Sequence, residues 1–299
     1  MPLPEMPSTV SRQSTSNYRP LFMSNLDFAK RSEPFQFIMF TRERHMAAAA
    51  NREGIDFVGP DLEVLGKDDR QSDQIYRISR HTLDDLSNVY EVIDCDRRFV
   101  RCNPINRDSE KEIEEVISRG AAAIMLPYFK SFEEAEEFTK LVAGRAKAIL
   151  LVETRGAVSN LEKILSKLSI DRIHIGLNDL AIDTCSKNRF VLLCSEWMQE
   201  ICAISRRFET PFGFGGIARI VNNEIPVSPN LVYAQYARLG ARCAVIARSF
   251  THGLSPDQFG GELAKARNRI EYWFSQDRES LDEAHAELLS KSKNWNEPR

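Results

Sequence analysis

The segments VETRGAV (residues 152–158) and IGLNDLA (175–181) decide the fold of this chain. Each is an apolar run, typical of a strand, that leads into a carboxylate: Glu153 in the first and Asp179 in the second. The two carboxylates lie 26 residues apart, about the length of one strand–helix–strand unit. Because parallel strands of one barrel end at the same edge, this spacing predicts that Glu153 and Asp179 meet at one end of neighbouring strands.

From residue 35 onward, apolar runs alternate with amphipathic stretches in eight strand–helix units. The strands are continuous apolar runs, as expected of a parallel sheet that is covered on both faces. Among the helical stretches are SFEEAEEFTKLVAG (131–144), with Ser131 at the N-cap position, and the long FVLLCSEWMQEICAISRRFE (190–209). The eight predicted strands lie in FQFIMF (35–40), IDFVGPDLE (55–63), YEVIDCDRRFVRCN (90–103), AAAIMLPYF (121–129), AKAILLVET (146–154), DRIHIGLND (171–179), TPFGFGG (210–216) and ARCAVIARSF (241–250).

Eight alternating units favour an α/β fold of the (β/α)8 TIM-barrel type. An open doubly wound sheet is the alternative, but its first strand is usually followed by a glycine-rich turn, and here TRERH (41–45) follows. We therefore expect an N-terminal leader at residues 1–34, a barrel domain at 35–275 and a C-terminal helical extension at 276–299. This extension either packs on the barrel or reaches a neighbouring subunit.

Composition excludes other classes of function. The 299 residues carry a formal net charge of −3 and no basic block, so nucleic acid is not an expected partner. No apolar run is long enough to span a bilayer, and the N-terminal stretch lacks the apolar core of a secretory signal. The six cysteines form no C-x-x-C pair and lie mostly in apolar segments, which predicts reduced thiols in a cytoplasmic protein.

The predicted strand ends carry many acids, arginines and amides. Reactive groups of TIM barrels lie at this end, so Glu153 and Asp179 are candidate ligands of one hard divalent cation, Mg²⁺ or Mn²⁺. Such an ion takes one or two protein carboxylates and fills its other positions with water and substrate oxygens. A 2-keto acid would bind it through its carbonyl and carboxylate oxygens, and the ion would act as a Lewis acid.

Arg101, at the end of the third strand, is the candidate cation for the substrate. Its planar guanidinium fork suits carboxylate and enolate oxygens, which makes it both a substrate-binding and a catalytic candidate. The alternative is a structural ion pair with Asp94 or Asp96. The backbone amides expected to orient the substrate carboxylate belong to Gly176, Leu177 and Asn178.

Asp61 and Glu63 follow the second strand. We expect them to hydrogen-bond waters on the metal, and Glu63 is also a candidate catalytic group. The alternative for both is an ion pair with Lys67 or Arg70.

The general acid or base is less evident. His252, near the end of the eighth strand, lies on the expected face and is a candidate proton shuttle. His174 lies inside the sixth strand, where a buried, neutral imidazole bonded to a neighbour is the expected state. The segment GFGGIAR (213–219) either binds an anion through glycine N–H groups or forms a tight turn. The remaining histidines are expected on surface helices or in the tail: His45, His81 and His285.

At these residues the chain resembles the HpcH/HpaI aldolase/citrate lyase family. The resemblance rests on segments that follow several of the predicted strands: DLE (61–63), VRCNP (100–104), GAAAIMLPYFKSFEEAEE (120–137), LLVETRGAVSNLEKIL (150–165) and HIGLNDLA (174–181). It implies a metal-dependent (β/α)8 barrel that cleaves or forms carbon–carbon bonds. It also implies that Glu153 and Asp179 are the metal ligands and that Arg101 is the substrate arginine.

The chain departs from both branches of that family. The pyruvate aldolases have a histidine just after the acid that ends strand two, whereas DLEVLGK (61–67) has none. They also carry glutamine two residues before the metal glutamate, where this chain has Leu151. The citrate lyase branch has a second acid after DLE, where this chain has Val64.

These observations predict a metal-dependent carbon–carbon lyase or aldolase that stabilises the enolate of a pyruvate-like 2-keto acid, and they leave the aldehyde or acyl partner open. The alternatives are a citrate lyase-like lyase or thioesterase on a malyl- or citramalyl-CoA ester, and a non-catalytic barrel that keeps the metal site. A CoA ester would need basic residues at the mouth, and Lys130, Arg155 and Arg219 are the candidates. The resemblance also implies a homo-oligomer.

Overall fold

The computed structural model of the chain describes residues 34–65, 81–221 and 227–295. Its strands are β1 (Gln36–Phe40), β2 (Phe57–Gly59), β3 (Phe99–Arg101), β4 (Ala123–Leu126), β5 (Lys147–Val152), β6 (Arg172–Ile175), β7 (Phe212–Phe214), β8 (Gly216–Ile217) and β9 (Cys243–Ile246). Its helices are α2 (Arg44–Arg52), α4 (Leu83–Tyr90), α5 (Ser109–Ser118), α6 (Phe132–Val142), α7 (Arg155–Lys167), α8 (Leu177–Asp183), α9 (Arg189–Leu193), α10 (Glu196–Arg207), α11 (Pro229–Leu239), α12 (Arg248–Thr251), α13 (Pro256–Phe274) and α14 (Arg278–Lys293), with a short 3-10 helix at Cys95–Arg97.

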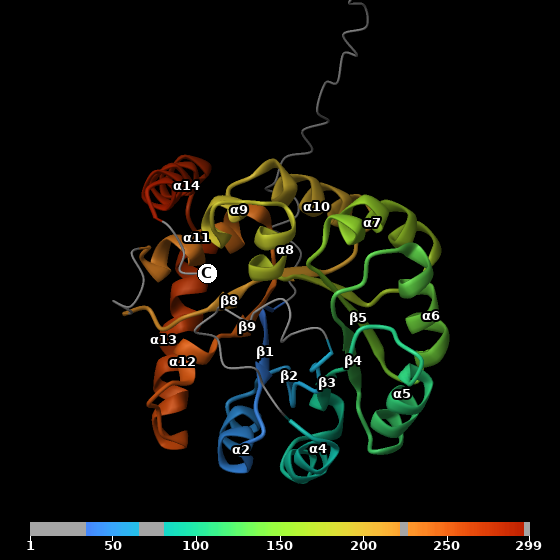
Figure 1. Ribbon diagram of the computed structural model, residues 1–299. Coiled ribbons are helices and arrows are strands. Elements are labelled where there is room, and N and C mark those ends of the chain that lie inside the picture. Colours follow the sequence, from blue (N-terminus) through green and yellow to red (C-terminus); the bar gives the residue numbers. More distant parts are fainter. Residues whose placement is uncertain (1–33, 66–80, 222–226, 296–299) are drawn as a thin grey trace, which may run out of the picture.

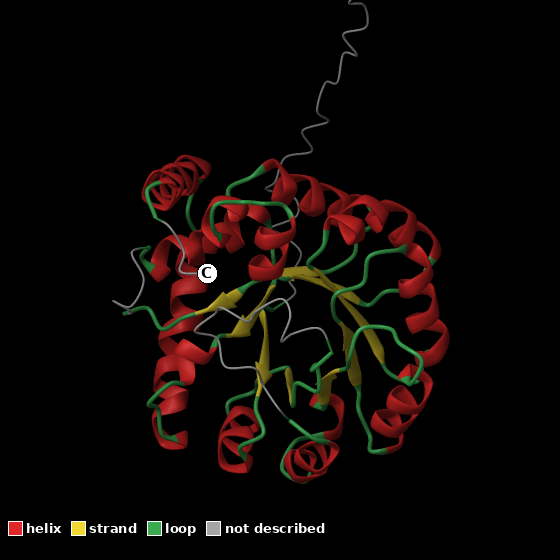
Figure 2. Cartoon of the chain, viewed as in Figure 1, coloured by secondary structure: helices red, strands yellow, loops and turns green. Residues whose placement is uncertain are grey.

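The strands are parallel and form two sheets, in the orders β2-β1-β9-β8 and β3-β4-β5-β6-β7. Backbone hydrogen bonds join the sheets at both seams. Leu62 N donates to Arg101 O between β2 and β3, and Arg242 N donates to Phe212 O between β9 and β7. Helices form an outer layer around the strands (Figure 2). This arrangement confirms the predicted TIM-barrel class.

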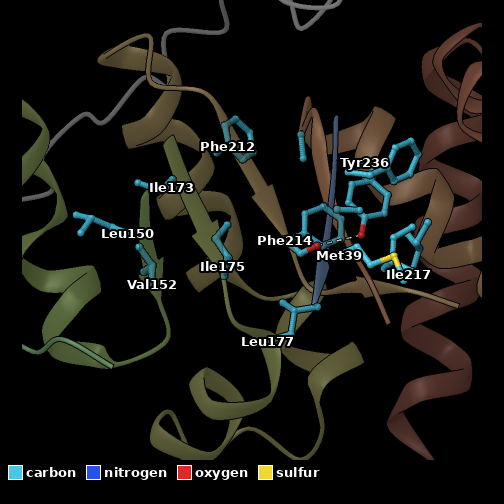
Figure 3. Close-up of a cluster of buried hydrophobic side chains, with 14 of the residues drawn as sticks. Met39, Leu150, Val152, Ile173, Ile175, Leu177, Phe212, Phe214, Ile217 and Tyr236 are labelled. Atoms are coloured by element: carbon cyan, nitrogen blue, oxygen red, sulfur yellow. Dashed lines mark hydrogen bonds between the residues drawn. The ribbon is translucent and has the colours of Figure 1, made fainter. Parts of the chain in front are cut away.

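Alternate residues of each strand point to opposite faces, which separates two apolar layers. On β5, Ile149 and Leu151 belong to a small cluster inside the ring, and Leu150 and Val152 belong to the large core under the helices. Figure 3 shows the outer layer where Tyr236 of α11 stacks on Phe214 of β7, with ring centroids 4.1 Å apart. The buried Tyr236 hydroxyl donates to Phe214 O, so packing and hydrogen bonding together fix α11 on the barrel.

Local sequence signals explain many element boundaries. Ser131 forms the predicted N-cap of α6, where its hydroxyl accepts from Glu134 N and the Glu134 side chain accepts from Ser131 N. The predicted seventh strand instead splits into β7 and β8, because Gly215 between them has φ +47° and turns the chain. The glycine-rich segment therefore includes a conformational turn.

Three other expectations need correction. The third strand is confined to Phe99–Arg101, because the residues just before it form the 3-10 helix. The long helix predicted at 190–209 is two helices, α9 and α10, since α9 ends at Leu193 and a new helix begins at Glu196. The short helix α8 directly after β6 was not predicted. The sequence also predicts a helix over QSDQIYRISRHTLDDLSN (71–88); its residues 71–80 lie outside the described residues, and α4 begins at Leu83.

The C-terminal helix α14 packs against α11 and α9 of the same chain (Figure 1). Its apolar side holds the buried Leu281, Ala284 and Leu288. The buried Asn188 amide donates to Ser292 O at 2.9 Å and ties the end of α14 to the start of α9. The helical extension thus covers its own barrel. Among the described helices, none combines the length and the apolar character required to cross a membrane.

His174 on β6 is buried and neutral, as predicted. Its Nε2 lies 2.9 Å from Gly215 O, so the proton is on Nε2. Burial lowers the pKa of His174 to about 4, although the hydrogen bond to the Gly215 carbonyl opposes that shift.

This lowered pKa predicts a pH-dependent contribution to stability. In the unfolded chain His174 binds a proton near pH 6.5, whereas in the folded chain it binds one only near pH 4. Folding free energy is therefore lost as the pH falls through this window. Between pH 7 and 5 the loss from this group is about 2 kcal/mol. We expect urea unfolding of His174→Gln to lack that component. Parallel pH profiles of the variant and the unmodified protein would contradict it.

Candidate metal and substrate site at the strand ends

Glu153 lies directly after β5 and is 2% exposed. Its Oε1 accepts a hydrogen bond from Tyr128 N at 2.8 Å, which anchors the carboxylate to the loop after β4. The next residue, Thr154, caps α7 through Ala157 N and donates its hydroxyl to Phe129 O at 2.7 Å. The Glu-Thr pair therefore turns the chain from strand to helix and fixes Glu153 at the barrel end.

Asp179 lies near Glu153 on the next unit along the chain. It is the third residue of α8 and is half-buried, and its charge raises the pKa of Glu153. Gly176, which precedes α8, makes this approach sterically feasible. A Cβ built at Gly176 would lie 2.5 Å from Glu153 Oε2, closer than any side chain tolerates.

The electrostatics of Glu153 are unfavourable for an anion. Burial raises its pKa well above the usual value, the charges of Asp179 and Glu63 raise it further, and Arg101 opposes them. Among the described residues, no group of three or more His, Cys, Asp or Glu side chains forms a ready-made metal cage. Two adjacent hard carboxylates that repel each other nevertheless fit a cation such as Mg²⁺, which needs only one or two protein ligands.

Arg101 ends β3 and pairs with both acids that follow β2. Its Nε and Nη2 donate to Asp61 Oδ1 and Oδ2 at 2.8 and 2.7 Å, and Nη2 lies 3.3 Å from Glu63 Oε2. Burial opposes the guanidinium charge, but Asp61 and Glu63 outweigh it, so the pKa of Arg101 is raised well above its usual value. The guanidinium also lies over the Phe40 ring at 4.9 Å. Arg101 is therefore a permanently charged, oriented cation.

Two alternatives from the sequence can now be compared with these contacts. The alternative pairing of Arg101 with Asp94 or Asp96 is wrong, since Arg101 pairs with Asp61 and Glu63, and Asp94 lies 4.0 Å from Arg97. Lys67 and Arg70, the alternative partners of these acids, lie outside the described residues.

Two further residues lie near Asp61, and the sequence reasoning missed the first of them. His81, expected on the surface, is half-buried, and its Nδ1 accepts a hydrogen bond from Asp61 N at 2.9 Å. Arg248, the first residue of α12, is close enough that the charge of Asp61 acts on its pKa. His81 follows Asp61 by 20 residues, so no local pattern links them. Arg248 could be predicted from the sequence, because it lies at the end of the eighth predicted strand, where site residues of a barrel are expected.

The other predicted site residues lie around this centre. The Gly176 N–H donates to Val152 O within the sheet, which leaves the amides of the buried Leu177 and the exposed Asn178 at the start of α8. His252 is exposed at the end of α12, and its carbonyl accepts from Arg219 Nη2. The remaining basic residues at the mouth are exposed: Arg155, whose N–H donates to Asp183 Oδ2, and Lys130, which lies over the Tyr128 ring.

Known proteins of this fold are similar over most of the chain. A HpcH/HpaI aldolase/citrate lyase family protein from Burkholderia cenocepacia superposes with a TM-score of 0.58 and 13% identity, covering 83% of this chain and 97% of its own. The protein CitE from Mycobacterium tuberculosis, in complex with magnesium and pyruvate, superposes with a TM-score of 0.54 and 16% identity, covering 87% of this chain and 99% of its own. The citrate lyase beta subunit from M. tuberculosis, complexed with oxaloacetate and magnesium, superposes with a TM-score of 0.55 and 15% identity, covering 84% of this chain and 100% of its own.

These structural similarities establish the fold, and sequence establishes the family. No curated protein sequence matches the chain. The family model described as HpcH/HpaI aldolase/citrate lyase matches residues 36–190, which include the ends of β2 to β6 and the charged residues Asp61, Glu63, Arg101, Glu153 and Asp179. The chain therefore belongs to the HpcH/HpaI aldolase/citrate lyase family, a family of carbon–carbon lyases.

Proposed function

We propose that this protein is a Mg²⁺- or Mn²⁺-dependent lyase that makes or breaks a carbon–carbon bond next to the enolate of a pyruvate-like 2-keto acid. The observation that carries the proposal is the buried carboxylate of Glu153, whose pKa is raised by burial and by Asp179 and Glu63. The magnesium complexes of the M. tuberculosis relatives with pyruvate and oxaloacetate support the same assignment.

Glu153 and Asp179 are the proposed metal ligands. A divalent cation bound there supplies a Lewis acid that polarises a carbonyl group. The buried Glu153 is held by Tyr128 N, so only one of its oxygens is committed to the protein by that bond. The site can therefore offer a fixed ligand oxygen without reorganising the loop.

Arg101 is the proposed anion-binding group. Because Asp61 takes Nε and Nη2 together, the plane of the guanidinium is fixed before a substrate arrives. The charge of Arg101 interacts with that of Glu153, which supports a position of the guanidinium near the reacting oxygen. In this proposal Asp61 and Glu63 orient Arg101, in addition to the contact with metal-bound waters that the sequence suggested. A preoriented cation stabilises negative charge as it develops on the substrate.

A CoA ester is the second candidate substrate. Lys130 and Arg155 are both exposed at neighbouring strand ends, and the start of α7 at Gly156 packs directly against Lys130 O. Two exposed cations at the mouth would meet the phosphates of such a substrate. The third possibility, a barrel without catalysis, is an outcome of the following experiment.

Exchange of pyruvate methyl protons into D₂O, followed by NMR, tests enolate formation directly. We expect exchange that requires Mg²⁺ or Mn²⁺ and that falls at least about 100-fold in Glu153→Gln. Glu110→Gln, an exposed glutamate on α5, is the matched control and should exchange like the unmodified protein.

Absence of exchange, with metal still bound, would exclude the pyruvate proposal and direct the search to CoA esters. If neither substrate class reacts, the non-catalytic alternative holds.

His81 offers a second test, of the acid side of the pH profile. Burial lowers its pKa below 6.5, and its Nδ1 must be unprotonated to accept from Asp61 N. We expect the exchange rate to fall as the pH drops below about 6.5, because protonation breaks the bond that fixes Asp61 and hence Arg101. His81→Asn keeps an acceptor that does not titrate and should reduce this fall. His81→Leu should slow exchange about fivefold at pH 7.5. An unchanged acidic limb in His81→Asn would contradict the role.

A further inference from the structure

The opposite end of the barrel contains a buried arginine with an unused donor. Arg172 is the first residue of β6 and is 8% exposed. Its Nη2 donates to Gln36 Oε1, but its buried Nη1 has no hydrogen-bond partner among the described residues. A guanidinium group in this position is costly to bury unless an acceptor meets each of its donors.

Arg172 lines a cavity of about 140 Å³. Its other lining residues include the first residues of β1, β2 and β5, namely Gln36, Phe57 and Lys147, together with Asp171. Because Glu153 follows the last residue of β5, this cavity and the proposed metal site lie at opposite ends of the barrel. At about 30 Å³ per water molecule, the volume accommodates a few waters or one small oxyanion.

The charges around the cavity favour an anion. Within the described part of the chain, neither Arg172 nor Lys147 forms a salt bridge within 4.0 Å. The nearby carboxylates are engaged by the backbone: Asp171 Oδ2 accepts from Ala148 N and Asp56 Oδ2 accepts from Phe37 N, both at 2.8 Å. Burial raises the pKa of Asp56, and Arg172 and Arg267 oppose this shift from a distance. Among the residues that the structure describes, Arg172 therefore has no counter-ion in contact.

Lys147 provides the second cation and the route of entry. It is exposed, and its Nζ lies 5.5 Å from the centre of the Phe57 ring. Asp171 is also exposed, so the cavity opens to solvent between them. A ligand that enters here would lie beside both cations, because Lys147 and Arg172 both line the cavity.

We propose that this cavity is a binding site for one small oxyanion, such as inorganic phosphate or a carboxylate, held between the Arg172 guanidinium and Lys147 Nζ. The bound anion supplies the acceptor and the negative charge that Arg172 lacks. It stabilises the N-terminal end of the barrel and is independent of the metal and keto-acid chemistry at the other end.

Isothermal titration of the metal-free, full-length protein with sodium phosphate tests the site, with sodium acetate as the carboxylate arm and sodium chloride at equal ionic strength as the screening control. We expect saturable 1:1 binding of phosphate or acetate, whichever is the preferred oxyanion, and none of chloride. Lys147→Gln and Arg172→Gln should each weaken binding at least tenfold. Lys167→Gln, an exposed lysine at the end of α7, should bind like the unmodified protein.

Lys147 is exposed, so its variant should fold even if Arg172→Gln does not, and pyruvate proton exchange by Lys147→Gln should be unchanged. The absence of saturable binding would overturn the proposal and leave a water-filled cavity. Binding that survives both substitutions, or equal binding of chloride, would also overturn it.

Discussion

The repulsion among buried carboxylates at one end of the barrel is the constraint on which the site depends. The charges of Asp179 and Glu63 act on Glu153, and burial of Glu153 makes its own negative charge more costly. Arg101 offsets part of this charge, and Asp61 fixes Arg101 by two hydrogen bonds. The excess negative charge that remains is what distinguishes a cation site from a structural ion pair, since an ion pair alone would be satisfied by Arg101.

The fold holds these groups together through steric and hydrogen-bonding details outside the site. Gly176 lets α8 start against Glu153, Thr154 ties α7 to the β4 loop, and Asn103 Oδ1 accepts from Val64 N and Leu65 N to hold the segment after Glu63. Each is a position where the backbone of one unit contacts the side chain of a neighbouring unit. The family membership and this geometry point to the same end of the barrel, while the opposite end contains separate charges, around Arg172, that do not contribute to the chemistry proposed.

The sequence predicted those parts of the site that follow from strand periodicity. The convergence of Glu153, Asp179 and Arg101 could be predicted because each lies at or just after the end of an apolar run, and parallel strands bring such positions together. The pairing of Arg101 with Asp61 was not found, because charge spacing along the chain cannot choose among several nearby acids. His81 was missed because its contact with Asp61 depends on how the chain returns after the second strand. The split of the helix at 190–209 was missed because its apolar pattern continues through the break between Leu193 and Glu196.

The central claim, that buried carboxylates form a cation site, is tested most directly by urea unfolding of Glu153→Gln with and without Mg²⁺. The amide keeps an acceptor for Tyr128 N and removes one buried charge. Because the folded pKa of Glu153 is raised, the unmodified protein loses stability as the pH rises above about 4.5, and the variant does not. The account predicts that without metal at pH 8 the variant is more stable by about 1–2 kcal/mol, and that Mg²⁺ stabilises only the unmodified protein. A variant that is less stable without metal, or that gains equally from Mg²⁺, would contradict it.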